Sequence, residues 1–178
     1  MKKYPVIEFW FDEIDEAMWW ERDAQFDHVL KEKFLCLHQA AVRGELYADR
    51  ADPLGRLQEI ILLDQLSRNI FRGTPKAFAF DTQALVLAQE AISVQAQDAL
   101  PVNQKAFLYM PFMHSESLLI HEKAFELFSE PGLEEYLDYE IQHCNVLKRF
   151  GRYPHRNAAL GRQSSEAELE FVGDHSDF

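Results

Sequence analysis

Apolar residues recur at intervals of three and four along most of the chain, and this spacing constrains the fold more than any other feature of the sequence. Within residues 21–43 the apolar positions are Phe26, Val29, Leu30, Phe34, Leu37 and Ala41. That interval places them on one face of an α-helix. No segment shows the apolar–polar alternation of a half-buried strand. We therefore predict an all-α fold of six to eight helices, stacked antiparallel because their connections are short.

Several helix boundaries follow from residues that start or stop helices. Asp52-Pro53 predicts the start of a helix that runs to about Phe71, and Asp81 is predicted to cap the next one. Pro111 is expected to kink or end a helix over 103–113. Residues 151–163 are predicted to form a loop. The remaining signals are glycine stops at Gly44 and Gly151 and a capping box, Ser165-x-x-Glu168.

Length and charge narrow the class of protein. A chain of 178 residues with 47% hydrophobic content is most simply one domain, 1–178, with a sizeable core. The net charge of −12 argues against a nucleic-acid partner. Two cysteines do not indicate a disulfide framework, and no apolar run reaches 18 residues. These features predict a cytoplasmic protein with no membrane partner.

The segment 63–74 carries an unusual polar face at the end of the helix that begins at Pro53. At 100° per residue, Asp64, Gln65, Arg68, Asn69 and Arg72 fall within an arc of roughly 140°. A helix that only filled a core would not need these groups. Asp64 precedes Arg68 by four residues, so an internal ion pair is one explanation. An anion site is the other, because guanidinium groups bind carboxylate or phosphate with two hydrogen bonds.

A second polar segment, residues 141–165, contains no Asp or Glu. It carries five basic residues and two histidines in an otherwise acidic chain, which predicts a local anion site. We expect an anionic small molecule or an acidic peptide to bind where the two segments meet. The predicted ligand-binding residues are Asp64, Arg68, Asn69, Arg72, Arg149, Arg152, His155, Arg156 and Asn157.

Three blocks together resemble a known family. They are 63–74 (LDQLSRNIFRGT), 109–116 (YMPFMHSE) and 149–157 (RFGRYPHRN), accompanied by Phe9-Trp10-Phe11 and Phe26-Asp27. The chain resembles, over nearly its whole length, the bacterial domain-of-unknown-function family nine-two-four. The resemblance implies a helical fold similar to tetratricopeptide repeats and implies no particular activity. Ser67 departs from the proline that the family often carries there, and no 34-residue repeat is visible in the sequence itself.

Metal and nucleophile chemistry are poorly supported by the spacing of the polar residues. His114 and His121 would share a helix face but lie about 10.5 Å apart along the axis, too far for one ion. Glu140-x-x-His143 has the spacing of a di-iron helix, but such bundles need two copies. Ser115 has no Gly-x-Ser-x-Gly elbow and is better explained as a helix cap. We therefore predict no metal site and no cofactor.

Three functions remain open. The first is a binding protein whose three blocks line an anion-binding cleft. The second is a hydrolase acting on a phosphorylated or carboxylated metabolite, with His114, Glu116 or His155 as the acid–base group. In a structural alternative, His155 only donates a hydrogen bond to a backbone carbonyl. The third function is a docking scaffold for another protein, without chemistry.

Overall fold

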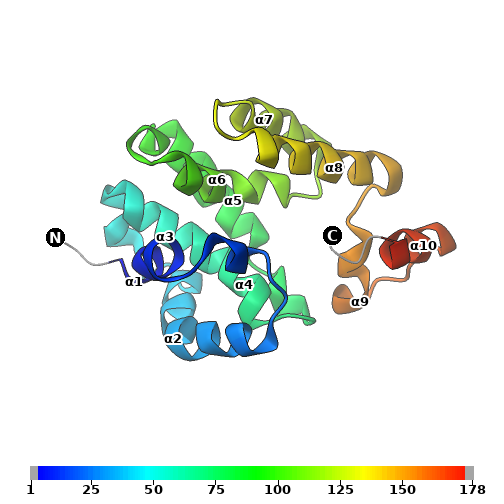
Figure 1. The fold of residues 1–178 in the computed structure, drawn as a ribbon, viewed down its shortest axis with the longest axis horizontal. Coiled ribbons are helices and arrows are strands. Elements are labelled where there is room, and N and C mark those ends of the chain that lie inside the picture. The colour runs from blue at the N-terminus through cyan, green and yellow to red at the C-terminus, as the bar shows by residue number, and fades with distance from the viewer. Residues whose placement is uncertain (1–3, 175–178) are drawn as a thin grey trace. The chain divides into compact units, whose positions relative to one another are not determined.

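The computed structural model describes residues 4–174, and all regular secondary structure in that range is helical. The α-helices are labelled α1 to α10, and short 3-10 or π-helical turns, η1 to η6, lie between them (Figure 1). The predicted all-α class is confirmed. The helices outnumber the six to eight predicted because α1, α4 and α9 are only 4, 6 and 4 residues long. Within the described residues, no helix is both long and apolar enough to cross a bilayer.

Backbone contacts divide the chain into two compact units. Among the described residues, the first unit comprises 4–72 and 76–111, and the second comprises 73–75 and 112–174. The first unit is therefore interrupted in sequence, because the chain leaves it at residue 73 and returns at residue 76. The expectation of one domain over 1–178 stays a prediction.

The first unit is built around α3. Its helices are α1 (Pro5–Glu8), α2 (Ala24–Val42), α3 (Pro53–Leu63), α4 (Gln65–Ile70), α5 (Asp81–Ser93) and most of α6 (Val102–Met113). Helix α3 packs against α1, α2, α4 and α5. Residues 60–63 are almost completely buried, as expected for a helix that neighbours cover on several sides.

Helix ends in the first unit follow the local sequence, with one exception. Asp52 caps α3 by accepting a hydrogen bond from the Leu54 N–H at 2.9 Å, which confirms the predicted start. Gly44 follows α2 with a φ of 69°, the left-handed conformation expected of a glycine stop. The predicted cap at Asp81 is wrong. Helix α5 begins at Asp81 itself, so Phe80 occupies the capping position, and the Asp81 side chain binds Arg68.

The predicted continuous helix from Pro53 to about Phe71 is interrupted at Asp64. The backbone there has φ −92° and ψ −76°, and it separates α3 from α4. The hydrogen bond from the Arg68 N–H to the Asp64 carbonyl is long, at 3.4 Å. The Arg68 side chain donates to the same carbonyl at 2.9 Å. The oxygen is thus shared between backbone and guanidinium, a competition that helical spacing alone does not reveal.

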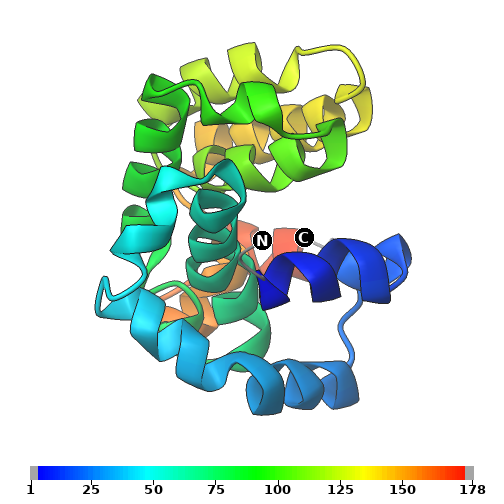
Figure 2. The same ribbon diagram turned by 90° about the vertical axis from the view of Figure 1, so that its left-hand side faces the viewer.

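The second unit holds a helical pair and a compact C-terminal segment. Helices α7 (Leu118–Phe128) and α8 (Glu134–Phe150) lie side by side, and η6 (Pro154–Arg156) contacts both α9 (Asn157–Leu160) and α10 (Glu166–Asp174) (Figures 1 and 2). Val146, Leu147, Tyr153 and Phe171 form its apolar cluster, with Phe150 and Val172 at the edge. This cluster joins α8 to α10 through the segment that follows Gly151.

Four further local predictions concern three positions in the second unit and Pro111, the last residue of the first unit. Gly151, with φ 70°, ends α8 as predicted. The capping box is confirmed, because Ser165 N–H donates to Glu168 at 2.8 Å and Glu168 N–H donates to the Ser165 hydroxyl at 3.3 Å. The loop predicted over 151–163 is wrong in part, since η6 and α9 lie within it. Pro111 lies inside α6, which continues to Met113.

Candidate functional site

Arg68, on α4, is held by two carboxylates of the first unit. Its Nη1 lies 2.8 Å from Oδ1 of Asp64, which confirms the ion pair expected from the four-residue spacing. It also donates two hydrogen bonds of 3.0 Å to Asp81. The side chain is only 16% exposed. The two anionic partners supply a complete structural explanation for a guanidinium at this position.

Asp27, on α2, receives the side chains of Asn69, on α4, and Arg72, two residues past the end of α4. Asn69 Nδ2 donates to Oδ1 of Asp27 at 2.8 Å. Arg72 donates to both oxygens, with Nε 2.5 Å from Oδ2 and Nη2 2.9 Å from Oδ1. Gln65 extends the network through a 3.3 Å contact with Asn69. A forked Arg–Asp pair of this kind fixes the geometry between α4 and its neighbour α2.

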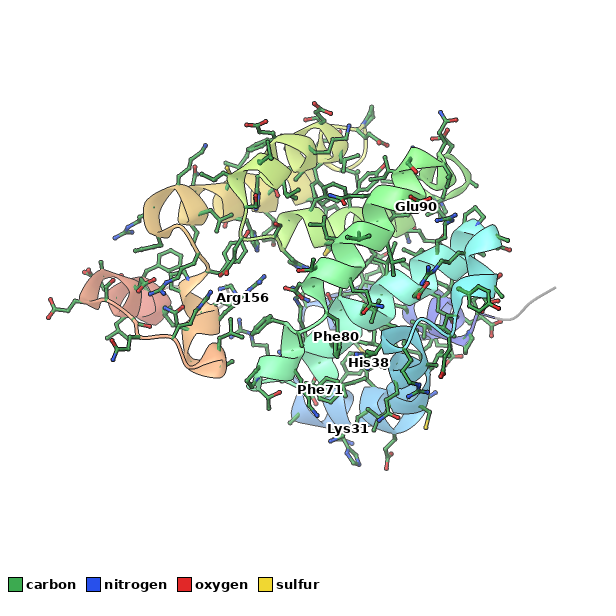
Figure 3. All side chains as sticks on the ribbon, turned by 180° about the vertical axis from the view of Figure 1, so that it is seen from behind. Lys31, His38, Phe71, Phe80, Glu90 and Arg156 are labelled. Atoms are coloured by element: carbon green, nitrogen blue, oxygen red, sulfur yellow. The ribbon has the colours of Figure 1, made fainter. Side chains whose placement is uncertain are left out.

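A buried Ser–His pair lies close to this network. His38 Nε2 is 2.8 Å from the Ser67 hydroxyl, and that hydroxyl lies 3.4 Å from the Leu62 carbonyl. Phe71 and Phe80 meet the His38 ring edge-on, at 5.3 and 5.4 Å (Figure 3). Burial lowers the pKa of His38 to about 4, so the imidazole is neutral at pH 7. Both residues are almost completely buried, which suits a core hydrogen bond rather than a nucleophile.

In the second unit, four successive carbonyl oxygens at the end of α6 and just beyond it, those of residues 112–115, each accept a hydrogen bond. The last carbonyls of a helix have no partner within the helix, so they need donors from elsewhere. The donors, in chain order of the acceptors, are Ser115 N–H, Tyr153 Oη–H, Arg156 Nη2–H and His121 Nε2–H, at 3.2, 2.6, 2.8 and 2.9 Å. Three of these donors are side chains from α7 and from the segment after α8.

Glu116, the next residue, is a second anchor for that segment. Its carboxylate accepts two hydrogen bonds from Arg162, at 2.8 and 2.9 Å, and one from the Tyr153 N–H at 2.7 Å. Burial alone would raise the pKa of Glu116. The hydrogen bonds from Arg162 and Tyr153, with the charges of Arg156 and Arg162, leave that pKa below its ordinary value. Glu116 is therefore ionised at neutral pH.

His121 and Glu140 form a buried pair between α7 and α8. Nδ1 of His121 lies 2.5 Å from Oε1 of Glu140, and the two side chains are 1% and 0% exposed. Burial raises the pKa of Glu140. The other ring nitrogen, Nε2, lies 2.9 Å from the Ser115 carbonyl and 3.1 Å from the Tyr153 hydroxyl. One imidazole thus joins α8, the α6–α7 segment and the segment after Gly151.

Three more histidines, His114, His143 and His155, gather around Tyr153, and we refer to these three as the histidine cluster. The rings of His143 and His155 lie 5.4 and 5.6 Å from the Tyr153 ring, and His114 lies 6.4 Å from His143. All three are partly exposed. Burial, followed by the charges of His114 and Arg156, lowers the pKa of His143 to about 3. The Arg156 guanidinium lies 4.6 Å from the centre of the Tyr153 ring.

Comparisons with known proteins identify the family to which the chain belongs. The family model described as bacterial protein of unknown function, DUF924, matches residues 6–175. The chain belongs to this family. A solved structure of a protein of unknown function from Agrobacterium tumefaciens is similar to it, with 32% sequence identity and a TM-score of 0.89. The match covers 96% of this chain and 97% of that one. No curated protein matches the chain.

Most of the predicted binding residues of this DUF924 chain have structural partners. Arg152 donates to both oxygens of Glu168, at 2.7 and 2.9 Å, and to the Gln163 carbonyl. Asn157 contacts Ser164 and Arg162. Arg149 lies over the Phe150 ring at 4.6 Å. The later part of the block 109–116, residues 112–116, meets the block 149–157 in the second unit through Tyr153 and Arg156.

Several residues that organise these contacts were not among the predicted site residues. They are Asp27, His121, Glu140, His143, Tyr153 and Glu168. The spacing Glu140-x-x-His143 is that of a di-iron helix, but the partner of Glu140 is His121, which lies 19 residues earlier on another helix. Within residues 4–174, no group of three or more His, Cys, Asp or Glu side chains is arranged to hold a metal ion.

Proposed function

We propose that this DUF924 protein binds an anionic small molecule, a carboxylate or a phosphate, at the histidine cluster of its second unit. The observation that carries the proposal is the gathering of nitrogen-bearing side chains on one tyrosine. The chain has seven histidines, and four of them, His114, His121, His143 and His155, lie in the network centred on Tyr153. Titratable groups that perturb one another in this way are typical of functional sites.

Charge supports an anion as the ligand. His143 has a lowered pKa partly because positive charge on His114 and Arg156 opposes its protonation. An anion bound beside these groups would offset that repulsion and favour the protonated imidazole. Binding would therefore take up a proton, and the affinity would be higher at pH 6 than at pH 8.

Not all of the arginines predicted to bind a ligand would contact it. Arg68 and Arg72 are matched by carboxylates within the first unit, and Arg152 and Arg162 are matched in the second. We assign these four arginines to bracing the structure. We propose that the histidine cluster, together with Arg156 beside the Tyr153 ring, would contact the anion.

A thermal-shift titration tests the proposal. Inorganic phosphate and citrate would be compared with sodium chloride at equal ionic strength, at pH 6 and pH 8. A ligand at 100 times its Kd adds about 2.7 kcal/mol to the free energy of unfolding. We expect stabilisation at pH 6 that is weaker at pH 8 and is reduced in His114→Gln and His155→Gln.

The matched control is His28→Gln. His28 is an exposed histidine on α2 whose imidazole faces Glu32 at 3.3 Å, so its removal changes the histidine count without touching the cluster. The control should bind anions as the parent chain does. Equal stabilisation by chloride, phosphate and citrate, at both pH values, would exclude the proposed site.

A hydrolase acting on the same ligand class is the second candidate. Nδ1 of His143 lies 2.8 Å from the Tyr139 carbonyl, so the neutral ring donates there and carries its lone pair on Nε2. An imidazole held in one tautomer can accept a proton from water or substrate. Turnover of a panel of phosphate esters that disappears in His143→Gln and persists in His28→Gln would support this candidate.

A further inference from the structure

The hydrogen bonds around His121 fix where its protons lie. A carbonyl oxygen only accepts, and Nε2 of His121 lies 2.9 Å from the Ser115 carbonyl. The nearby Tyr153 hydroxyl, at 3.1 Å, already donates its proton to the Met113 carbonyl at 2.6 Å. Among residues 4–174, therefore, no donor faces Nε2, and that nitrogen must itself carry a proton.

The other side of the ring requires a second proton. Nδ1 of His121 lies 2.5 Å from Oε1 of Glu140, and a carboxylate oxygen and a lone-pair nitrogen repel one another at that distance. We propose that His121 and Glu140 share one proton and that this proton locks the α6–α7 segment, residues 112–116, in place. The inference does not depend on the anion-binding proposal.

The surroundings of the pair favour one shared proton over none or two. Oε2 of Glu140 is buried and has no hydrogen-bond partner within the described residues, so a fully charged carboxylate is poorly solvated there. If His121 were an imidazolium and Glu140 were also protonated, the pair would carry a net positive charge close to Arg156. Two titratable groups interact with the pair itself, Tyr153 with Glu140 and His143 with His121. The groups that act on those two in turn are His114, Glu116, Cys144 and Arg156.

Loss of the shared proton would release the lock. The neutral ring would then have to place its only proton on Nδ1, facing the Glu140 carboxylate. Nε2 would present a lone pair to the Ser115 carbonyl, and the hydrogen bond that holds this residue would be lost. The segment that carries His114 and Glu116 would thus be held at neutral pH and freed in alkali.

Proton linkage provides a measurable consequence. Above the ordinary histidine pKa of about 6.5, the unfolded chain binds one proton fewer at these two residues than the folded chain does. Stability from the pair is therefore complete below that pKa and declines as the pH rises. The equilibrium constant for unfolding should gain a factor of about ten per pH unit until the folded pair loses its proton.

Glu140→Gln is the discriminating variant. A glutamine amide can donate to Nδ1 of a neutral His121 that keeps its proton on Nε2, so the variant imitates the locked state without a shared proton. Urea unfolding of the full chain would be measured between pH 7 and pH 9. We expect the ratio of unfolding constants, parent over variant, to rise about tenfold per pH unit above pH 7 until the folded pair loses its proton. Contributions from other groups common to both chains cancel in the ratio.

A ratio that stays constant from pH 7 to pH 9 would overturn the proposal. A second measurement needs no variant. In the 15N-histidine-labelled chain at pH 8, we expect a slowly exchanging proton on Nε2 of His121 and a protonated or proton-sharing signal for Nδ1. A lone pair on Nε2 at that pH, or an Nδ1 that neither carries nor shares a proton, would equally overturn it.

Discussion

Arg162 donates two hydrogen bonds to the carboxylate of Glu116, at 2.8 and 2.9 Å, and so joins positions 46 residues apart in the second unit. The two side chains are 23% and 27% exposed. We expect Glu116→Gln to lower the free energy of unfolding by about 1–2 kcal/mol, because a partly buried guanidinium loses its anionic partner. Denaturant unfolding checks this value. Glu122→Gln, an exposed neighbour on α7, is the control and should change stability by less than about 0.5 kcal/mol.

Gly55 has a backbone neighbour that leaves no room for a side chain. A Cβ at this position would lie 2.1 Å from the Asp49 carbonyl oxygen. Gly55→Ala should therefore force the η3 turn (Tyr47–Ala51) away from α3 and destabilise the protein by more than 2 kcal/mol, about the upper range of overpacking changes. Gly173→Ala, where nothing lies within 4 Å, should be neutral or stabilise by up to about 1 kcal/mol. Equal melting temperatures for the two variants would contradict this account.

His38 should make stability depend on pH in mildly acidic solution. Burial lowers its pKa from 6.5 to about 4, so the unfolded chain binds this proton more readily than the folded chain. Its contribution is complete above pH 6.5 and is lost as the pH falls toward 4. The loss amounts to about 3 kcal/mol. Urea titrations at pH 4.5 and 7 should show a smaller difference for His38→Gln than for the parent chain, whereas His28→Gln should match the parent.

Glu168 should contribute to acid sensitivity at lower pH. Hydrogen bonds from Arg152 and from the Ser165 N–H lower the pKa of Glu168 to about 2. Stability from this carboxylate is present above its ordinary pKa of 4.5 and is lost as the pH falls toward 2. In Glu168→Gln this part of the acid transition should disappear. Hydrogen exchange of the α10 amides provides the local readout: protection should fall from pH 6 to pH 3 more in the parent chain than in the variant. An equal fall in both chains would be the contrary result.

Local sequence signals predicted the elements whose cause is local. The Asp64–Arg68 pair and the Ser165–Glu168 capping box depend on spacings of four and three residues, and both are present. The break at Asp64 was not predicted, because it depends on which group binds the Asp64 carbonyl. The side chain of Asp81 likewise binds Arg68 across 13 residues instead of capping its own helix.

The acid-free segment 141–165 shows the corresponding limit for the site. Its arginines suggested an anion site because no carboxylate lies near them in sequence. In the folded chain, Arg162 finds Glu116 and Arg152 finds Glu168, both from outside the segment. The His121–Glu140 pair is also formed across two helices. The sequence correctly shows an excess of basic over acidic residues in this segment. Tertiary packing decides which carboxylates pair with those basic residues, and the spacing of residues in a single sequence does not reveal that packing.

The row of carbonyls at the end of α6 has a consequence for the order of events during synthesis. Its donors Tyr153 and Arg156 lie about 40 residues further along the chain than the oxygens of Met113 and His114 that they bind. When α7 and α8 have just emerged from the ribosome and residues 153–156 have not, this helix end is therefore exposed to water. The last stage of translation, which delivers Tyr153 and Arg156, is therefore the stage at which these carbonyls can obtain their protein donors.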